Sequence, residues 1–379
     1  MADAQARVQA LLDDLVARDV ERGVQVAAYL DGRQVIDAWA GVADQATGRP
    51  VDGDTLFCTF SVIKGVTATA IHLLAERGQL DYDTPVAACW PAFAVSGKGR
   101  ITPRHILSHS AGIPQLPDGL AAADLCDWDA VCQRVAQLEP LWEPGAATGY
   151  HAITFGWVLG ELVRRIDGRP IERFVQEEIC APLGITSLYL GIPDAVEPRV
   201  AVLEPGPPPP WPPPADSLYR RVLPAALEPL HELANRGDVR RAVLPASGGI
   251  MNARAIARHY AAMVGDGLDG VRLLGPTRLR QATTLQTEEV DQVLRYPVPK
   301  ALGYFLGGRL SRVGARRAVF GHEGAGGAIG LGDAEHRFAI GIAKNRLADG
   351  WIGQETSALI IREARDALGI ADAGERVTR

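Results

Sequence analysis

Lysine is scarce in this sequence, although basic residues as a group are not. Four lysines stand among the 39 lysines and arginines: Lys64, Lys98, Lys300 and Lys344. A chain that prefers arginine so strongly has few lysines to place by chance. Acidic residues outnumber basic ones, and the formal net charge of −6 argues against a nucleic-acid partner, because phosphate binding needs a clustered basic surface.

Cysteines are few and form no recognisable pattern. They make an odd-numbered set without Cys-x-x-Cys spacing: Cys58, Cys89, Cys126, Cys132 and Cys180. Neither a disulfide framework nor a zinc site is therefore expected, and we predict no metal and no other cofactor. Cys58 lies close before Ser61 and raises the alternative of a thiol enzyme. A buried structural thiol is the preferred interpretation.

Long apolar runs are also missing. No segment offers the ~18 or more uninterrupted apolar residues that a membrane span needs, so no membrane partner is expected. The first residues are partly acidic and lack the apolar centre of a secretory signal, which favours a cytoplasmic protein. They predict an amphipathic helix to about Ala17 instead, with one apolar face: Val8, Leu11, Leu12 and Leu15.

The composition is otherwise that of an ordinary globular protein. Hydrophobic residues make up 47% and charged residues 22%, which excludes disorder as the state of the bulk of the chain. A length of 379 residues suffices for one large domain or two interleaved ones with a substantial core.

Strand signals lie toward the two ends of the chain. Runs 24–30 and 34–39 are joined by Asp31-Gly32, a strong hairpin signal. A further run covers 55–60, and four more cover 303–310, 318–321, 327–331 and 338–343. We therefore predict an α+β fold in which both termini build one antiparallel sheet flanked by helices.

Helical signals fill the middle of the chain. A helix apolar on almost all sides, and therefore buried, is predicted from Ser61 to about Arg77, ended by Gly78. Others are predicted near 154–166, 171–179 and 354–368. Residues 1–80 and 240–379 are predicted to form an α/β domain, and residues 81–239 a mostly helical insertion. Asn252 is predicted to cap a helix.

A proline-rich stretch at 205–214 is the one low-complexity segment. Such runs favour polyproline II and exclude helix. A stiff surface connector is the preferred interpretation. Trp211 at its centre keeps a functional lid as the alternative, in which this side chain contacts substrate.

Ser61-Val62-Ile63-Lys64 carries the clearest chemical signal. Residues i and i+3 on a helix share a face, so the two side chains can touch. A helix N-terminus favours negative charge on serine, and its amide can donate to an oxyanion. Burial lowers the pKa of a lysine, which makes a neutral amine beside the hydroxyl a credible base. Ser-x-x-Lys alone is weak evidence, and an N-capping serine with a snorkelling lysine remains open on this motif by itself.

Three further stretches accompany that motif: 103–113, Gly149-Tyr150-His151-Ala152, and 321–328. In order and approximate spacing, the four together resemble the superfamily of class C β-lactamases, penicillin-binding proteins and family VIII carboxylesterases. The resemblance runs from about Val24 to Asn345. It implies a β-lactamase/transpeptidase-like fold with the active site where the α/β domain meets the helical insertion.

The resemblance also implies roles for individual residues. Ser61 corresponds to the acylated nucleophile, Lys64 to the general base or proton relay, and Tyr150 to the tyrosine that shuttles a proton. A phenolate-like tyrosine needs a nearby cation, which Lys64 would supply. His322-Glu323-Gly324 falls where the family has Lys-Thr-Gly, so the amides of Ser61 and Ala325 would form the oxyanion hole. His151 and Gly324 are expected to contact substrate, and His322 to tune the site by titrating near neutrality.

Two departures from the family pattern affect the substrate. Ala152 stands where β-lactamases have an asparagine that holds the acylamino group, and His322 where they have a lysine that attracts a carboxylate. Both favour the esterase branch. The resulting hypothesis is a serine acyl-hydrolase for small-molecule acyl esters or amides, with no prediction of the oligomeric state. The alternative is an acyltransferase for an amine or alcohol acceptor; a β-lactamase, a DD-peptidase and a non-catalytic binding protein rank lower.

Other motifs favour structural roles. No Gly-x-Ser-x-Gly motif occurs, which argues against an α/β-hydrolase. His105 and His109 have metal-like spacing without His-Glu-x-x-His, and packing under the Ser61 helix is the preferred interpretation. The glycines of 324–330 fit close backbone approach at a strand edge better than a nucleotide loop.

Overall fold

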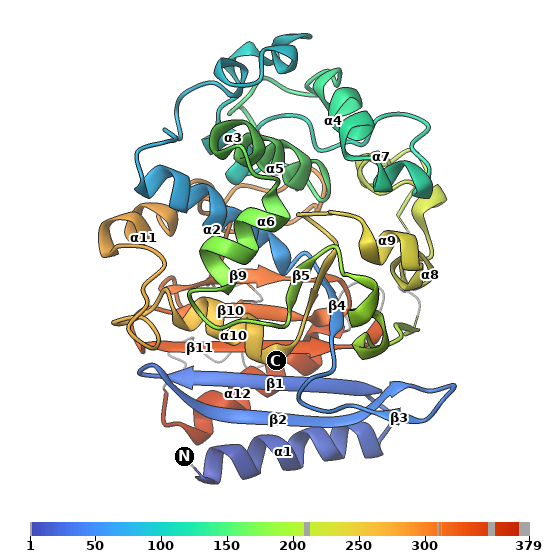
Figure 1. Cartoon of the computed structure of the whole chain (residues 1–379), viewed down its shortest axis with the longest axis vertical. Helices are drawn as coiled ribbons and strands as arrows, with labels where there is room; N and C mark the ends of the chain where they lie inside the picture. The colour runs from blue at the N-terminus through green and yellow to red at the C-terminus, as the bar shows by residue number, and fades with distance from the viewer. Residues whose placement is uncertain (1, 208–212, 309–310, 312, 348–352, 371–379) are drawn as a thin grey trace.

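The computed structural model describes residues 2–207, 213–308, 311, 313–347 and 353–370. Its main element is an antiparallel sheet in the order β3-β2-β1-β11-β10-β9-β8. The strands are β1 (Gly23–Leu30), β2 (Arg33–Asp44), β3 (Arg49–Pro50), β8 (Phe305–Leu306), β9 (Val319–Glu323), β10 (Ile329–Asp333) and β11 (Phe338–Lys344). Because β1 pairs with β11, the two ends of the chain share one sheet, as predicted (Figure 1).

The hairpin between β1 and β2 follows from its two turn residues. Asp31 and Gly32 have φ values of 50° and 72°, the left-handed pair that a two-residue type I′ turn requires. Leu30 therefore faces Arg33 across the turn. The predicted hairpin is confirmed, with β2 continuing five residues beyond the expected end at Trp39.

Helices cover both faces of the sheet. On one face lie α1 (Ala2–Ala17) and α12 (Gly353–Ala367), which share an apolar cluster with alternate residues of β1. On the other lies α10 (Ala253–Ala261), capped by the Asn252 side chain as predicted. Close packing there needs glycine, because a Cβ on Gly341 of β11 would lie 2.5 Å from the Ala253 carbonyl oxygen. The predicted α+β architecture is confirmed.

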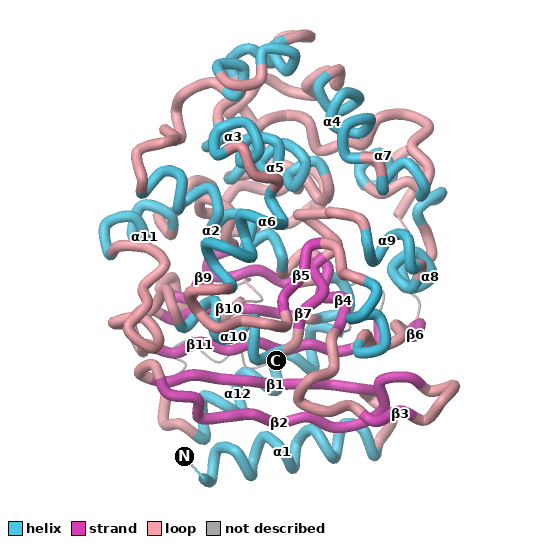
Figure 2. Tube along the Cα trace, viewed as in Figure 1, coloured by secondary structure: helices cyan, strands magenta, loops and turns pink. Residues whose placement is uncertain are grey.

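The remaining part of the molecule is mostly helix and loop, with α5 at its centre (Figure 2). Its α-helices are α3 (Pro103–Leu107), α4 (Trp128–Ala136), α5 (Thr154–Asp167), α6 (Ile171–Val175), α7 (Leu218–Val222), α8 (Leu230–Asn235), α9 (Gly237–Arg241) and α11 (Pro276–Ala282). Shorter 3₁₀ helices lie at Val86–Ala88, Pro91–Ala94, Lys98–Arg100, Ala122–Cys126, Asp194–Arg199, Ala225–Leu227 and Ala325–Gly327, and a π-helical turn follows α6 at Gln176–Cys180. None of the helices in the described ranges has both the length and the apolar character that crossing a membrane requires.

Two smaller sheets connect the helical part to the rest. In the first, β4 (Phe57–Phe60) and β5 (Leu188–Leu190) both pair with β7 (Gly249–Met251). In the second, β6 (Glu204–Pro205) pairs with β12 (Arg346–Leu347). The domain boundaries at 80/81 and 239/240 stay a prediction.

The long buried helix is α2 (Ile63–Glu76), and every residue from Ile63 to Ala75 is buried. It begins two residues after the predicted start, because Ser61 and Val62 form a turn that precedes it. The Lys64 amide donates to the Ser61 carbonyl at 3.0 Å, so the two residues still occupy one turn. Gly78 follows the helix with φ of 70°, as the sequence indicated.

Candidate active site

Ser61 lies where strand β4 gives way to helix α2. The preceding residue, Phe60, has φ of 48°, a left-handed conformation that costs energy for an aromatic residue. The pairing of β4 with β7 is interrupted between Cys58 and Phe60, and Thr59 Oγ1 donates to the Gly249 carbonyl at 3.0 Å. The chain is therefore held in a sharp change of direction that places Ser61 at the junction.

Lys64 is fully buried, and three oxygen atoms surround its amine. Nζ lies 3.0 Å from Ser61 Oγ and donates to the carbonyl oxygens of Ala152 and Ala246, each at 2.7 Å. Burial lowers the pKa of Lys64 well below its ordinary value, and no carboxylate of the described residues forms an ion pair with it. A neutral amine has two N–H bonds for the two carbonyls, so its lone pair faces the Ser61 hydroxyl.

Helix packing fixes one of the two carbonyls that hold Lys64. Thr67 Oγ1, one turn further along α2, donates to the Pro245 carbonyl at 2.6 Å. From the other side, a Cβ on Gly156 of α5 would lie 2.5 Å from the Ala246 amide nitrogen. Residues 245–246 are therefore clamped between α2 and α5, and the Ala246 carbonyl cannot move away from the amine.

All of the scarce lysines prove to be interior residues. Lys98 and Lys300 are fully buried and Lys344 is 4% exposed. Lys300 forms an ion pair with Asp291 at 2.9 Å. Lys64 differs from these three because its amine faces a serine hydroxyl. Burial alone therefore does not single out Lys64 among the lysines, and the catalytic role that the sequence interpretation gave it stays a prediction.

Tyr150 approaches the same two residues from the loop before α5. Its phenol interacts with the Ser61 hydroxyl, and Lys64 Nζ lies 4.8 Å from the centre of its ring. Burial raises the pKa of Tyr150 far above its ordinary value, and the Ser61 hydroxyl offsets only part of this effect. The phenol is therefore protonated in the resting site. This differs from the predicted phenolate-like tyrosine, because burial favours the neutral phenol; burial also lowers the pKa of the Lys64 amine, which makes it a weaker cation partner.

His322 on β9 is buried beside Tyr150. Its ring stacks on Phe305 with centroids 4.4 Å apart and lies 6.0 Å from the Tyr150 ring. Nδ1 donates to the Glu323 carbonyl at 2.7 Å, which leaves Nε2 as an acceptor. Burial, with a smaller effect of nearby Lys64, lowers the pKa of His322 to about 3. The expectation that this histidine titrates near neutrality is therefore wrong.

The end of β9 comes into direct contact with the Ser61 segment at a glycine. A Cβ on Gly324 would lie 2.1 Å from the Thr59 carbonyl oxygen, so only glycine fits. The Gly324 amide donates to the Ala328 carbonyl at 2.7 Å and is not available for the predicted substrate contact. Ala325, the next residue, is exposed. Among the described residues, the amides of Ser61 and Ala325 donate to no backbone carbonyl, as oxyanion donors require.

The two remaining predicted substrate contacts have different outcomes. His151 is fully buried; its Nδ1 donates to the Gly149 carbonyl at 2.7 Å and its Nε2 accepts from the Ile113 amide at 3.1 Å. Burial lowers its pKa to about 4. Because both ring nitrogens are hydrogen-bonded to backbone groups, His151 has a structural role and does not make the predicted substrate contact. Trp211 lies outside the described residues.

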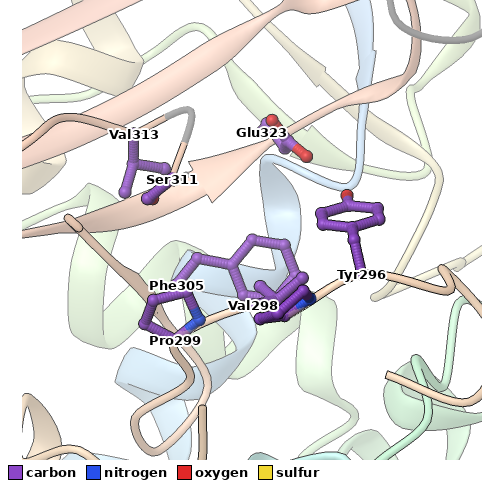
Figure 3. A pocket seen from close by; sticks show the side chains of 8 residues that line it. Tyr296, Val298, Pro299, Phe305, Ser311, Val313 and Glu323 are labelled. Atoms are coloured by element: carbon purple, nitrogen blue, oxygen red, sulfur yellow. The ribbon is translucent and has the colours of Figure 1, made fainter. Parts of the chain in front are cut away.

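A small pocket lies beside Phe305, next to the His322 side of the site (Figure 3). Its lining is mostly apolar: Tyr296, Pro297, Val298, Pro299, Phe305, Ser311, Val313 and Glu323. Phe305 contacts both the pocket and the His322 ring, so the pocket lies next to the Tyr150–His322 pair.

Comparison with known proteins identifies the family. The profile of the Beta-lactamase family matches residues 8–364. The chain belongs to the beta-lactamase family. Over 347 residues it is 36% identical to the Esterase/beta-lactamase LipL of Mycobacterium tuberculosis, a match that covers 86% of this chain and 77% of that protein.

Solved structures agree with the beta-lactamase family assignment. A family VIII carboxylesterase has a TM-score of 0.88 at 31% identity, covering 96% of this chain and 97% of the other. A penicillin-binding protein homolog from Caulobacter crescentus has a TM-score of 0.87 at 33% identity, covering 96% and 98%. The predicted β-lactamase/transpeptidase-like fold is confirmed, and this beta-lactamase family protein is a serine hydrolase.

The structure of this beta-lactamase family hydrolase adds residues that sequence reasoning did not place in the site. Asp291 accepts from the Tyr150 amide at 3.1 Å; nothing in its sequence surroundings marks it. His109, predicted to be structural, stacks on Phe155 and lies 5.0 Å from the Tyr150 ring. His105 accepts from the Thr102 amide and caps α3.

Replacing His322 tests its corrected role. His322→Ala should lower turnover less than loss of Lys64 does, and the pH–rate profile between about pH 5 and 8 should keep its shape, because a group with a pKa of about 3 stays neutral there. Initial rates on an aryl ester across this range measure the effect. His322→Gln, which keeps a neutral acceptor, is the matched control. Disappearance of a pH limb in the alanine variant would show that the imidazole does titrate in this range.

Proposed function

We propose that this hydrolase is a carboxylesterase that acts through an acyl-enzyme on Ser61. The observation that carries the proposal is the buried amine of Lys64, which lies 3.0 Å from Ser61 Oγ and whose pKa burial lowers. A neutral amine so placed accepts the hydroxyl proton as Oγ attacks the substrate carbonyl. The relatives support this chemistry, because they include the Esterase/beta-lactamase LipL and a family VIII carboxylesterase.

The other groups complete the reaction. The amides of Ser61 and Ala325 donate to the oxyanion of the tetrahedral intermediate. When the intermediate collapses, the bond to the leaving alcohol breaks, and the Tyr150 phenol donates its proton to that oxygen. The proton held by Lys64 then restores the phenol. In deacylation, water attacks the Ser61 ester, Ser61 Oγ leaves with a proton, and the free acid is released.

The surroundings of the nucleophile favour neutral esters over β-lactams. Ala152 offers the site a methyl group and directs its carbonyl to Lys64, so it supplies no amide to hold an acylamino side chain. His322 is neutral and provides no fixed positive charge for a substrate carboxylate. The mostly apolar lining beside Phe305 also favours an uncharged substituent over a charged one.

Substrate comparison tests this selectivity. We expect kcat/KM for short-chain aryl esters to exceed that for penicillins and cephalosporins by roughly a hundredfold or more, since each missing polar contact is worth one to several kcal/mol in a buried site. Parallel rate measurements with a chromogenic ester and a chromogenic cephalosporin decide the matter. Efficient cephalosporin turnover would contradict the role given to Ala152 and His322.

Transfer to an amine or alcohol uses the same acyl-enzyme and therefore the same residues. Hydrolysis and acyl transfer can be distinguished by adding an amine or alcohol acceptor to the ester assay and identifying the products by mass spectrometry. We expect the free acid as the main product, whereas an amide or a new ester as the main product would identify an acyltransferase.

A further inference from the structure

The loop that carries Tyr150 has no regular secondary structure, yet three consecutive amides in it are fixed. The Gly149 amide donates to the His109 carbonyl at 2.9 Å. The Tyr150 amide donates to Asp291 Oδ1 at 3.1 Å, and the His151 amide to His109 Nδ1 at 3.1 Å. Two of these acceptors belong to one turn, while the acceptor of the Tyr150 amide comes from a separate segment.

Asp291 is fully buried and organises its own segment as well as the Tyr150 loop. Besides the Tyr150 amide, Oδ1 accepts from the amides of Val293 and Leu294, each at 2.8 Å. The Gln292 amide donates to the Thr148 carbonyl at 2.8 Å. Segment 291–294 and the Tyr150 loop are therefore joined on both sides of the carboxylate.

Lys300 completes the arrangement from a third segment. Its Nζ lies 2.9 Å from Asp291 Oδ2 and donates to Thr148 Oγ1 at 3.0 Å, with both charged side chains fully buried. The Lys300 backbone is itself fixed, because its amide donates to the Thr287 carbonyl at 2.8 Å. The Asp291–Lys300 pair is therefore hydrogen-bonded to the Tyr150 loop at two points, the Thr148 hydroxyl and the Tyr150 amide.

A buried ion pair contributes little net stability, because desolvation of the two charges offsets their attraction. Stability alone is therefore a poor reason for placing one of the four lysines here. We propose, on the basis of the function proposed for Tyr150, that Asp291 and Lys300 form a positioning pair that holds the Tyr150 phenol against Ser61 and Lys64. The pair acts through Tyr150 and touches neither the nucleophile nor the base.

Paired substitutions separate positioning from folding. Asp291→Ala/Lys300→Met removes both charges, so no stranded charge is left in the core, but it also removes the acceptor of the Tyr150 amide. We expect kcat to fall roughly 10- to 100-fold with a smaller change in KM, because misplacing a reacting group by about 1 Å costs that much. Asp291→Asn/Lys300→Met keeps an oxygen acceptor for the Tyr150 amide but lacks the Lys300–Thr148 contact. We expect it to recover part of the turnover and to keep a several-fold loss.

A double-mutant cycle with Tyr150→Phe distinguishes positioning of Tyr150 from a general structural role. It measures whether the loss of kcat depends on the Tyr150 phenol. In the Tyr150→Phe background, the alanine–methionine pair should lower kcat less than twofold, since the phenol that it positions is already absent. Should that pair fail to fold, Thr148→Val removes only the hydroxyl that Lys300 contacts. Thr148→Val should lower kcat several-fold when residue 150 is tyrosine, and should leave kcat unchanged in the Tyr150→Phe background.

Three results would count against the positioning pair. Unchanged kcat in a folded Asp291→Ala/Lys300→Met variant would overturn the positioning pair while leaving the proposed function intact. If that double variant does not fold, unchanged kcat in Thr148→Val would have the same meaning. An equal loss in both backgrounds would also overturn it, because the pair would then not act through Tyr150. Full turnover in Tyr150→Phe alone would overturn both the positioning pair and the proposed role of Tyr150.

Discussion

Ser61→Ala should reduce ester hydrolysis to the uncatalysed background while leaving the fold intact. Among the described residues, Ser61 carries the one serine or threonine hydroxyl that bonds to Lys64 Nζ, so without it the proposed acyl-enzyme cannot form. The side chain caps no helix, since Val62 holds the capping position of α2 without a side-chain bond. The free energy of unfolding should therefore change by less than the ~1–2 kcal/mol of a lost cap. Steady-state rates and thermal unfolding measure the two quantities.

A matched serine variant controls for nonspecific damage. Ser110 bonds to Ser108 within its own turn and takes no part in the Ser61–Lys64–Tyr150 contacts. Ser110→Ala should keep most of the turnover. Substantial hydrolysis by folded Ser61→Ala would mean that another residue is the nucleophile.

Lys64→Met should lower kcat by roughly a hundredfold or more, the usual worth of a general base. Lys64→Arg is the matched control for charge and should be no better, because a guanidinium stays protonated and cannot accept the serine proton. Methionine fills a similar volume without a charge, so the core should remain packed.

The pH dependence has a defined sign. In the proposed mechanism the active form of Lys64 is the neutral amine, and burial lowers the pKa of Lys64. Activity should therefore fall as the pH drops through this lowered pKa and level off above it. Lys64→Met should lose that acid limb. An unchanged acid limb in a folded Lys64→Met variant would assign the limb to another group.

Tyr150→Phe should cause a loss of similar size, and combining it with Lys64→Met should add little. In the proposed mechanism, the phenol and the amine serve one proton path around Ser61, which both groups adjoin, and residues that act as a unit are strongly non-additive. Losses that multiply in the double variant would contradict a shared relay.

Local sequence patterns sufficed for these elements and for the proximity of Ser61 and Lys64. The Asp31-Gly32 hairpin and the α2 helix depend on neighbouring residues; the hairpin occurs where it was predicted, and α2 begins two residues later than predicted. Ser61 and Lys64 are three residues apart, so one helical turn brings them together. The later start of α2 follows from the turn that Ser61 and Val62 form before the helix.

Features that depend on distant segments could not be predicted. The carbonyls that hold Lys64 belong to Ala152 and Ala246, 88 and 182 residues away in sequence. The low pKa of His322 results from burial against Phe305, and a single histidine in a sequence does not reveal its burial. The Tyr150 amide lies 141 residues from Asp291 in sequence, so a local pattern could not place this carboxylate beside the Tyr150 loop.

Intact-protein mass spectrometry after reaction with a fluorophosphonate tests the central claim most directly. The account predicts one covalent adduct per chain, mapped to Ser61 by peptide sequencing, and none in Ser61→Ala. Labelling should also be slowed in Lys64→Met, because the hydroxyl is then no longer activated. An adduct on any other residue, or no adduct on the folded native enzyme, would contradict the assignment of Ser61 as the nucleophile.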